Sequence, residues 1–384
     1  MSGGSPAVTA VHRRRLLAAR HRLSVPAGSA AEVTAAVVAL HGTDPATVHL
    51  SVRARLGDSS LKSVGEELYD GSLVRMHGMR RTVFVVPVEL APVVRAASRA
   101  VTVREQRNVL KYLTAAGLGE DWLDSVNAQV LEVLAELGEA TGAELAERVP
   151  RLRTAVPGPS GAPPFSIGTR LLTLLGMRGA VVRRAPRGGW TSNQFRWALA
   201  PALPEPEPAE ARATLARLWL SAYGPGQLTD LQWWTGWTLT ETHAALTAVG
   251  AVPVELDEGP GYALAETLDA DAPDGNWAAL LPALDPTPMG WKHRDWYLPD
   301  DEQRIRLHDR SGNIGPTVWW NGRVVGGWAQ RRTGEVVWEP LTALDAEATA
   351  AVEAERDRLA AWLADSPVTV TPRFRTPLER EFAG

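Results

Sequence analysis

The chain has 384 residues, of which 45% are hydrophobic and 22% charged, and its formal net charge is −4. At roughly 150 residues per domain, this length predicts two or three domains of a soluble globular protein. The absence of cysteine excludes disulfides, thiolate metal sites and a cysteine nucleophile.

The sequence contains no apolar run near the roughly 20 residues of a membrane helix. No apolar segment follows the basic residues at the N-terminus. We therefore expect neither a membrane span nor a signal peptide, and a cytoplasmic location by default. The eight histidines are scattered without a metal-ligand spacing, so we expect no metal, and nothing in the sequence indicates a cofactor.

The first block of the chain predicts four helices and a hairpin, in that order. The helices are predicted over residues 13–23, 29–42, 45–56 and 61–71. Ser29 with Glu32 three residues later predicts a capping box, and Asp44 before Pro45 predicts a helix start. The segment "LVRMHGMRRTVFVVP" predicts two strands around a turn. Short helices followed by a basic hairpin are typical of a winged helix.

The same order recurs twice. Residues 121–149 predict a helix, a turn and a helix, residues 165–182 predict a helix leading into a strand, and the next turn carries Arg183, Arg184 and Arg187 on a wing. After the acidic, proline-rich linker "PALPEPEPAEA", a third helix pair is predicted at Gln227 to Trp234 and Leu239 to Val249.

The rest of the chain predicts short strands, with an Asn-Gly turn in "WNGRV", then a helix from Asp345 to Leu363 and a strand-like "PVTVTPRF". We therefore predict a mostly α protein with a small β part. Three tandem winged helices would occupy residues 1–118, 119–203 and 204–268. A β-barrel or β-sheet module with the last helix would occupy residues 269–384.

Charge is distributed unevenly along these blocks. Residues 1–118 carry 16 Lys and Arg against 8 Asp and Glu, and residues 148–203 hold nine arginines and no acidic residue. Two basic blocks in an acidic protein favour contact with a polyanion such as nucleic acid, and arginines spread for solubility are the alternative.

Four segments stand out in chain order: "VVALHGTDPATVHLSVRAR", "LVRMHGMRRTVFVVP", "LLPALDPTPMGWKHRDWYL" and "VWWNGRVVGGWAQ". Together they resemble the winged-helix family that contains the bacterial AlkZ-type DNA glycosylases, over nearly the whole chain. The resemblance implies three winged helices around a DNA channel with an appended β-barrel. It also implies removal of bulky alkylated bases and unhooking of interstrand crosslinks, often as self-resistance to genotoxic natural products.

The sequence departs from the family at the catalytic turn. Where the family has a glutamine, an aliphatic residue and then glutamine or aspartate, this chain has His41, Gly42 and Thr43. The family's polar side chains position or activate a water molecule at the sugar carbon. A second departure is Arg81, which replaces the glycine of a Met-Arg-Gly-Thr segment that approaches DNA in the family.

The remaining residues could still support this chemistry. An N7-alkylated guanine is already a cationic leaving group, so the enzyme must only place a water molecule and stabilise an oxocarbenium-like sugar. His41, with an ordinary pKa of about 6.5, could orient or deprotonate that water, Thr43 could share it, and Asp44 could stabilise the sugar. The alternatives are a helix-end histidine, a turn threonine and an N-cap aspartate.

Further candidates would contact DNA. His49 and Arg53 lie four residues apart, so they share one helical face, which either lines a channel or is solvated. His77, Arg80 and Arg81 lie at the first hairpin, where Arg80 and Arg81 would bind phosphate and His77 is a further candidate on the same surface.

Three functions remain open. The first is a monofunctional DNA glycosylase that acts on double-stranded DNA, as a monomer. The second is a DNA-binding protein without catalysis, either a damage sensor or a transcriptional regulator, which the altered turn favours. The third is a winged-helix scaffold that binds protein and has no affinity for duplex DNA.

Overall fold

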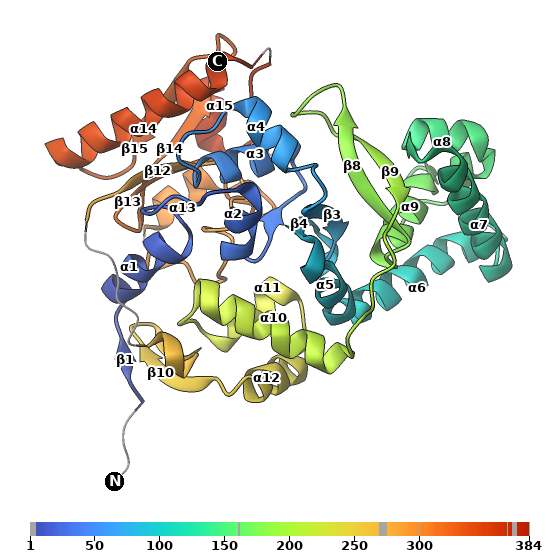
Figure 1. Ribbon diagram of the computed structural model, residues 1–384, viewed down its shortest axis with the longest axis horizontal. Coiled ribbons are helices and arrows are strands. Elements are labelled where there is room, and N and C mark those ends of the chain that lie inside the picture. Colours follow the sequence, from blue (N-terminus) through green and yellow to red (C-terminus); the bar gives the residue numbers. More distant parts are fainter. Residues whose placement is uncertain are drawn as a thin grey trace.

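An order of helices followed by an antiparallel hairpin occurs three times along the chain, and a sheet with a long helix follows (Figure 1). The computed structural model describes residues 5–159, 162–268, 275–298, 300–366, 368–370 and 375–383. We call the three repeats the first, second and third units and residues 275–383 the C-terminal module. The winged-helix assignment of the units remains a prediction.

The first unit begins with α1, whose N-cap is Thr9. Ser29 caps the next helix as predicted, but the Glu32 carboxylate accepts from the backbone of Gly28 rather than completing a capping box. The elements are α1 (Ala10–Arg20), α2 (Ala30–Ala36), β2 (Leu40–His41), α3 (Pro45–Arg53), α4 (Leu61–Glu67), β3 (Leu73–His77), β4 (Val83–Pro87), α5 (Ala91–Ala97) and α6 (Arg99–Ala115).

The predicted helix over residues 29–42 is too long. The helix ends at Ala36, Val38 has a positive φ of 65°, and Leu40–His41 is a strand paired with β4. A left-handed residue with a β-branched side chain interrupts a helix, and the backbone enters the sheet instead. The prediction that His41 ends a helix is therefore wrong.

The helices α7 (Glu120–Leu137) and α8 (Gly142–Arg148) of the second unit lie apart from the rest of the protein, and α6 leads to them (Figure 1). The hydrophobic core of this unit is separate and includes Val109 and Leu113 of α6. The other elements of the unit are β5 (Glu139–Thr141), β6 (Ala155–Val156), β7 (Phe165–Ser166), α9 (Gly168–Met177), β8 (Val181–Arg187) and β9 (Gln194–Leu199).

The hairpins of the first two units form one sheet, in the strand order β2-β4-β3-β8-β9-β5. The junction between the two hairpins is a single antiparallel pair, Arg75 with Arg183. The catalytic turn predicted at residues 41–44 therefore lies at one end of a sheet whose other end belongs to the second unit.

The third unit has the predicted helix pair followed by a hairpin. N-terminal strand β1 (Ala7–Val8) adds to this hairpin in parallel. The elements of the unit are α10 (Pro208–Tyr223), α11 (Leu228–Thr235), α12 (Leu239–Ala248), β10 (Val252–Leu256) and β11 (Gly259–Ala263).

The C-terminal module is an open antiparallel sheet in the strand order β12-β13-β14-β15, and in the described residues it does not close into a barrel. The predicted Asn321–Gly322 turn is confirmed, because Trp320 pairs with Arg323 across it. Of "PVTVTPRF", residues 368–370 form no strand, and residues 367 and 371–374 lie outside the described residues. The elements are β12 (Ala278–Leu281), α13 (Asp301–Leu307), β13 (Thr317–Trp320), β14 (Arg323–Gln330), β15 (Val336–Pro340), α14 (Ala346–Ala364) and α15 (Pro377–Ala383).

The chain contains more β structure than the predicted mostly α fold. The described residues form sheets of six, four, three and two strands. Among the helices that the structure describes, none is both long and apolar enough to span a membrane.

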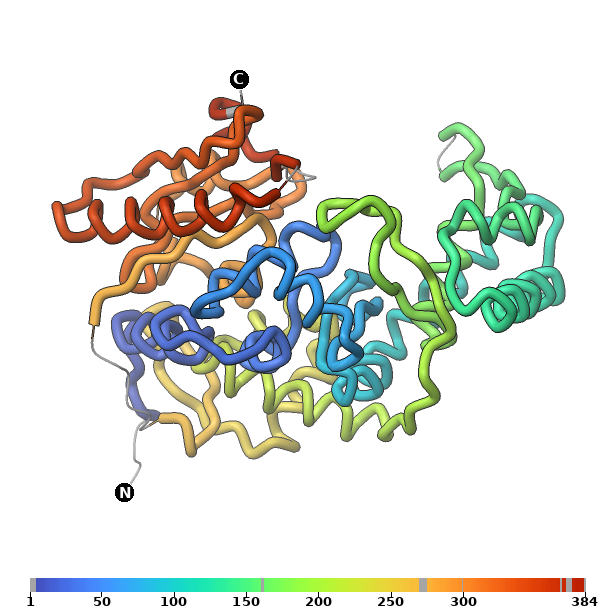
Figure 2. Tube along the Cα trace, turned by 45° about the horizontal axis from the view of Figure 1, so that its top comes forward, coloured from blue at the N-terminus to red at the C-terminus, as the bar shows by residue number. Residues whose placement is uncertain are grey.

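The first unit, the third unit and the C-terminal module share their cores. One cluster of buried side chains joins Leu17, Trp219 and Trp319, and a second joins Val48 to Trp328 and Trp362. In Figure 2 the N-terminal and C-terminal parts of the chain accordingly lie against each other. The predicted units follow each other in sequence, but three parts of the chain are packed as one body.

A fully buried ion pair connects the end of α3 to the C-terminal module. Arg55 donates to both carboxylate oxygens of Asp285, at 2.7 and 2.9 Å, and neither side chain is exposed. Ser51 donates to the same carboxylate, and Thr287 accepts from Arg55. Bidentate geometry with additional hydrogen bonds is what a buried pair needs to offset its desolvation cost.

A second long-range contact holds the hairpin of the second unit. The indole of Trp190, in the β8–β9 turn, donates to Ser366 at 3.1 Å and meets the rings of His49 and Trp362 edge-on. The hairpin thus reaches from the second unit to α3 and the end of α14 (Figure 2).

Replacing Asp285 with asparagine leaves the Arg55 charge buried without its partner, so we expect a loss of about 3–5 kcal/mol in the free energy of unfolding. Urea unfolding followed by circular dichroism measures this loss. Glu66→Gln is the matched control, because its pair with Lys62 is exposed and spans 3.7 Å. Equal unfolding curves for the two variants would contradict the role assigned to the buried pair.

Candidate functional site

The predicted catalytic turn connects β2 to α3. Leu40 and His41 pair with Val85 and Phe84 of β4, and the Gly42 amide continues the ladder by donating to the Val83 carbonyl at 2.7 Å. Asp44 then starts α3 by accepting from the Ala46 amide at 3.0 Å. Sheet pairing on one side and a capped helix on the other fix the backbone of the turn.

Gly42 is closely packed by its surroundings. A Cβ atom there would lie 3.1 Å from Val83 Cγ1 and 3.3 Å from a guanidinium nitrogen of Arg75. Arg75 is buried and donates a hydrogen bond to the Gly42 carbonyl. Its guanidinium also lies 4.4 Å from the Phe195 ring centre, so a side chain from the second unit helps to hold the turn.

His41 is nearly buried, with 8% of its surface exposed. Its ring meets Phe84 edge-on, and its Nδ1 has no hydrogen-bond partner among the described residues. Burial, and then the positive charges of Arg80 and Arg75, lower the pKa of His41 to about 3. The ring is therefore neutral at physiological pH, which corrects the predicted pKa near 6.5.

Thr43 and Asp44 differ in how firmly they are fixed. Asp44 is buried and caps α3, as its position before Pro45 predicts. Thr43 is half-buried. Of the three predicted catalytic residues, His41 has the free buried nitrogen, and Asp44 supplies a carboxylate at the start of the helix.

A cationic cluster lies beside His41. The guanidinium of Arg80 lies 4.2 Å from the Trp233 ring centre, and that of Arg294 lies 5.4 Å from the same ring. Burial, and then Arg294, lower the pKa of Arg80 to about 10. Arg294 also donates to His308 Nε2 at 2.7 Å, while His308 Nδ1 donates to the Arg304 carbonyl.

This cluster is held by aromatic rings and neutral acceptors. A ring face attracts a guanidinium without cancelling its charge, so the positive potential persists next to the turn. Arg75, Trp233, Arg294 and His308 are not among the residues predicted for this site. One signal was present, because both arginines lie in segments singled out in the sequence, Arg75 in "LVRMHGMRRTVFVVP" and Arg294 in "LLPALDPTPMGWKHRDWYL".

Three predicted DNA-contacting residues lie inside the protein. His49 is 1% exposed and packs against Trp190, and Arg53 pairs with Glu355 at 2.5 Å. His77 is buried next to Gly176 of α9. The alternative of a solvated face for His49 and Arg53 is therefore wrong, and their contact with DNA remains untested.

The other predicted contacts are more accessible. Arg81, Arg184 and Arg187 are exposed, whereas Arg183 is half-buried with its guanidinium 4.9 Å from the Trp197 ring centre. Arg80 and Arg81 have φ values of 52° and 62°. A positive φ favours glycine, so this turn is strained. Arg81 in the turn forms an ion pair with Glu105 at 2.8 Å.

Comparison with known proteins decides the family. The model of the family described as DNA glycosylase AlkZ-like matches residues 34–362. The chain belongs to the AlkZ-like DNA glycosylase family. A solved structure of the DNA glycosylase AlkZ from Streptomyces sahachiroi matches with a TM-score of 0.74 and 21% identity, over 92% of this chain and 97% of that chain. No curated protein matches.

Membership of the AlkZ-like family confirms the resemblance found in the sequence and indicates DNA as the partner. The structural match shows that the fold is shared over nearly the whole of both chains. The departure at His41–Gly42–Thr43 lies inside the matched range.

We expect Gly42→Ala to destabilise the protein by about 1–3 kcal/mol, because the added methyl forces Val83 and Arg75 to move. Urea unfolding tests this, with Gly57→Ala as the control, since its nearest neighbour would lie 4.0 Å away. If Gly42→Ala unfolds like Gly57→Ala, the close packing around the turn is not required.

Stability should fall as the pH drops from 7 to 5. Burial is the first cause of a lowered pKa in five histidines, so the unfolded chain takes up protons below about pH 6.5 that the folded protein does not. The affected residues are His21, His41, His49, His77 and His308. Glu379 opposes them, because burial raises its pKa to about 7 and its contribution to stability is lost as the pH rises from 4.5 to 7.

His308→Gln tests this balance, because glutamine can accept from Arg294 and donate to the Arg304 carbonyl without titrating. The pKa of His308 is about 4. The variant should therefore reduce the loss of stability between pH 7 and pH 5 by up to about 2 kcal/mol. The exposed His243, replaced by glutamine, serves as the control. An unchanged loss in His308→Gln would show that His308 does not contribute to it.

Proposed function

We propose that this protein is a monofunctional DNA glycosylase that hydrolyses the N-glycosidic bond of bulky N-alkylated purines or crosslinks in double-stranded DNA, as a monomer and without a cofactor. The observation that supports it most is the family match, which spans residues 34–362 and so includes both the turn and the cationic cluster.

The proposed reaction needs little proton transfer. The bond between the sugar carbon C1′ and the purine nitrogen breaks, and its electron pair neutralises the cationic base. Water then adds to the oxocarbenium-like sugar and becomes strongly acidic only after it has bonded. A weak base suffices for that proton, so a His41 with a pKa of about 3 would orient the water through Nδ1 rather than deprotonate it in advance.

Electrostatics gives Asp44 its proposed role. A cationic transition state next to the buried Arg75 would be unfavourable without compensation. Burial lowers the pKa of Arg75, and Tyr69 and then Asp44 act against this effect. The Asp44 carboxylate would supply the opposite charge. We assign Asp44 to stabilisation of the sugar, in addition to its place as the cap of α3. Thr43 would share the attacking water.

The positively charged side chains beside the turn would bind the DNA backbone. Among the contacts described above, no carboxylate pairs with Arg80 or Arg294. Their positive charge is therefore available to the phosphate groups of DNA. On the two hairpins the exposed Arg81, Arg184 and Arg187 would hold the duplex in register, with Arg183 behind them.

A second candidate is a DNA-binding protein without catalysis, such as a damage sensor. The observation that favours it is the replacement of the family's two polar side chains by a weakly basic histidine and a threonine. Such a protein would bind duplex DNA with a strong dependence on salt and release no base.

Base release from duplexes that carry N7-methylguanine or a nitrogen-mustard crosslink tests the proposal. Wild type should release base, and His41→Ala should release it about 10- to 100-fold more slowly, since orientation of the water is lost. His243→Gln is the matched control, because that histidine is exposed and outside the site.

The outcomes separate the candidates. Release that is equal in wild type and His41→Ala would remove His41 from the reaction. No release from either lesion, together with salt-sensitive duplex binding, would favour the binding protein. If the double variant His41→Gln, Thr43→Asp then released base, the rest of the site would be competent for catalysis and the side chains of the turn alone would account for the lost activity.

A further inference from the structure

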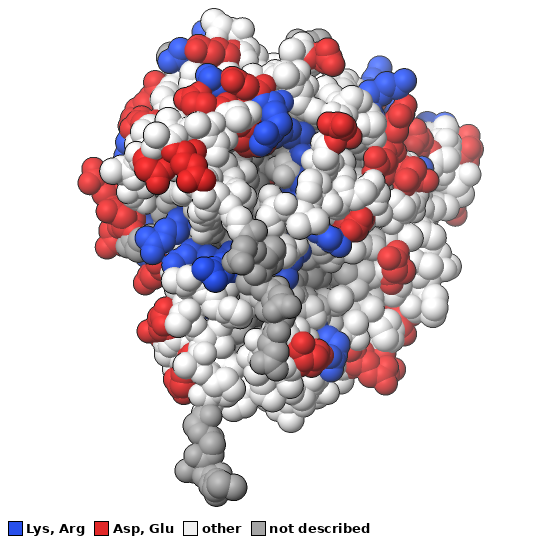
Figure 3. Space-filling model, turned by 60° about the vertical axis from the view of Figure 1, so that its left-hand side comes forward, with Lys and Arg blue, Asp and Glu red and all other residues white. Residues whose placement is uncertain are grey.

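A cavity of about 920 Å³ lies between α1, the β13–β14 turn and α14, and no residue of the His41 turn lines it. Its volume falls in the range of small-molecule and cofactor sites. On the face of the molecule that carries α1 and α14, basic side chains gather around a hollow (Figure 3). The protein therefore has a second concave, basic surface in addition to the proposed site.

Three arginines without carboxylate partners line this cavity. Arg14, Arg15 and Arg323 form no ion pair within the part of the chain that the structure describes. Arg14 is nearly buried and donates one hydrogen bond, to the Trp296 carbonyl at 2.6 Å. Burial, and then the charge of Arg323, lower the pKa of Arg14.

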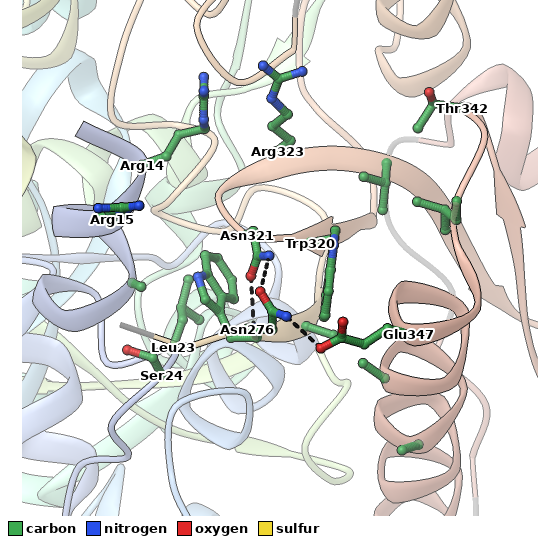
Figure 4. A pocket seen from close by; sticks show the side chains of 18 of the residues that line it. Arg14, Arg15, Leu23, Ser24, Asn276, Trp320, Asn321, Arg323, Thr342 and Glu347 are labelled. Atoms are coloured by element: carbon green, nitrogen blue, oxygen red, sulfur yellow. Dashed lines mark hydrogen bonds between the residues drawn. The ribbon is translucent and has the colours of Figure 1, made fainter. Parts of the chain in front are cut away.

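The fold explains why these like charges are close together. The Asn321–Gly322 turn returns the chain so that Arg323 pairs with Trp320, and a Cβ at Gly322 would lie 2.5 Å from Arg14 Cβ. In Figure 4 Arg14 and Arg323 extend in the same direction from α1 and β14. Arg14 and Arg323 line one cavity, and neither forms an ion pair within the described residues, although Asp257 acts on Arg14 from a distance. This packing favours an anion between the two guanidinium groups.

The cavity also has an aromatic wall and polar groups. Trp319 is completely buried, whereas its neighbour Trp320 is half-buried and lines the cavity. Asn276 accepts from Asn321 at 2.6 Å and donates to Glu347 at 2.5 Å, next to Trp320 (Figure 4). Glu347, the acidic residue that lines the cavity, is thus engaged with an amide.

We propose that this cavity binds a nucleotide unit, with the phosphate on the arginines and the base against the face of Trp320. Arginine provides planar donors for phosphate, and an indole face stacks on any base without reading its sequence. The source of the nucleotide is either an unpaired stretch of DNA or a free mononucleotide, and both present the same chemistry. The inference does not depend on base release at His41.

The test is binding of a fluorescein-labelled single-stranded decathymidylate, measured by fluorescence anisotropy at low salt. Arg15→Glu with Arg323→Glu should weaken binding at least about 10-fold. Neutral Arg15→Gln with Arg323→Gln should lower the slope of log affinity against log salt by about 1.4, because each phosphate contact on a single strand contributes about 0.7. Arg332→Glu is the matched control, as an exposed arginine of the same module outside the cavity.

Trp320 gives a second, independent readout. Trp320→Leu should weaken binding about 5-fold or more and Trp320→Phe should largely restore it, since stacking requires an aromatic ring. Thermal unfolding of each variant identifies any that fails to fold. Competition by thymidine monophosphate in the wild type would assign the cavity to free nucleotides, and competition by longer strands alone would assign it to DNA. The inference is overturned if the folded Arg15→Glu, Arg323→Glu protein binds the labelled strand as tightly as Arg332→Glu.

Discussion

The buried pair between Arg55 and Asp285 is the constraint on which the arrangement of the site depends. Asp285 accepts hydrogen bonds from both terminal nitrogens of the Arg55 guanidinium and from the Ser51 hydroxyl. Thr287 accepts from Arg55 and is also hydrogen-bonded to His21, the C-cap of α1. Arg55 follows the end of α3 and Asp44 starts the same helix. Fixing the far end of α3 in the C-terminal module therefore also fixes where the His41 turn begins. A displacement of this pair would move the turn against the sheet that holds its other side.

Around the turn, arginine side chains are held by aromatic rings. Arg75, Arg80 and Arg183 each lie over an aromatic ring. The two neighbouring histidines, His41 and His77, have a lowered pKa from burial first and from arginine charges second. A ring face holds an arginine in position without neutralising its charge, which a carboxylate would do. A polyanionic partner completes the balance, in agreement with a family that acts on DNA.

Local signals in the sequence predicted local structure well. The Asp44 cap, the Ser29 cap and the Asn321–Gly322 turn are each specified by the residues that form them. The failures share a cause, which is contact with distant parts of the chain. His49 and Arg53 show a surface pattern, but Trp190 and Glu355 cover them. The predicted helix beyond Ala36 is replaced by a strand that pairs with β4. Of the two predicted alternatives for the C-terminal module, the short strands form the open sheet. The periodicity of a short stretch of sequence carries no information about which distant residues will pack against it.

The sequence distance spanned by these contacts has a consequence for synthesis. Arg55 and Asp285 are separated by 230 residues, and Arg53 and Glu355 by 302. At roughly 5–20 residues per second, a ribosome delivers Asp285 about 10–50 s after Arg55. During that interval the first unit holds two arginines destined for the interior and has neither of their partners. The second unit, with its separate core, can form while the chain is still growing. The two buried ion pairs can form only after their partners in the last third of the chain have been made, so packing at the C-terminal end of α3 is completed late in synthesis.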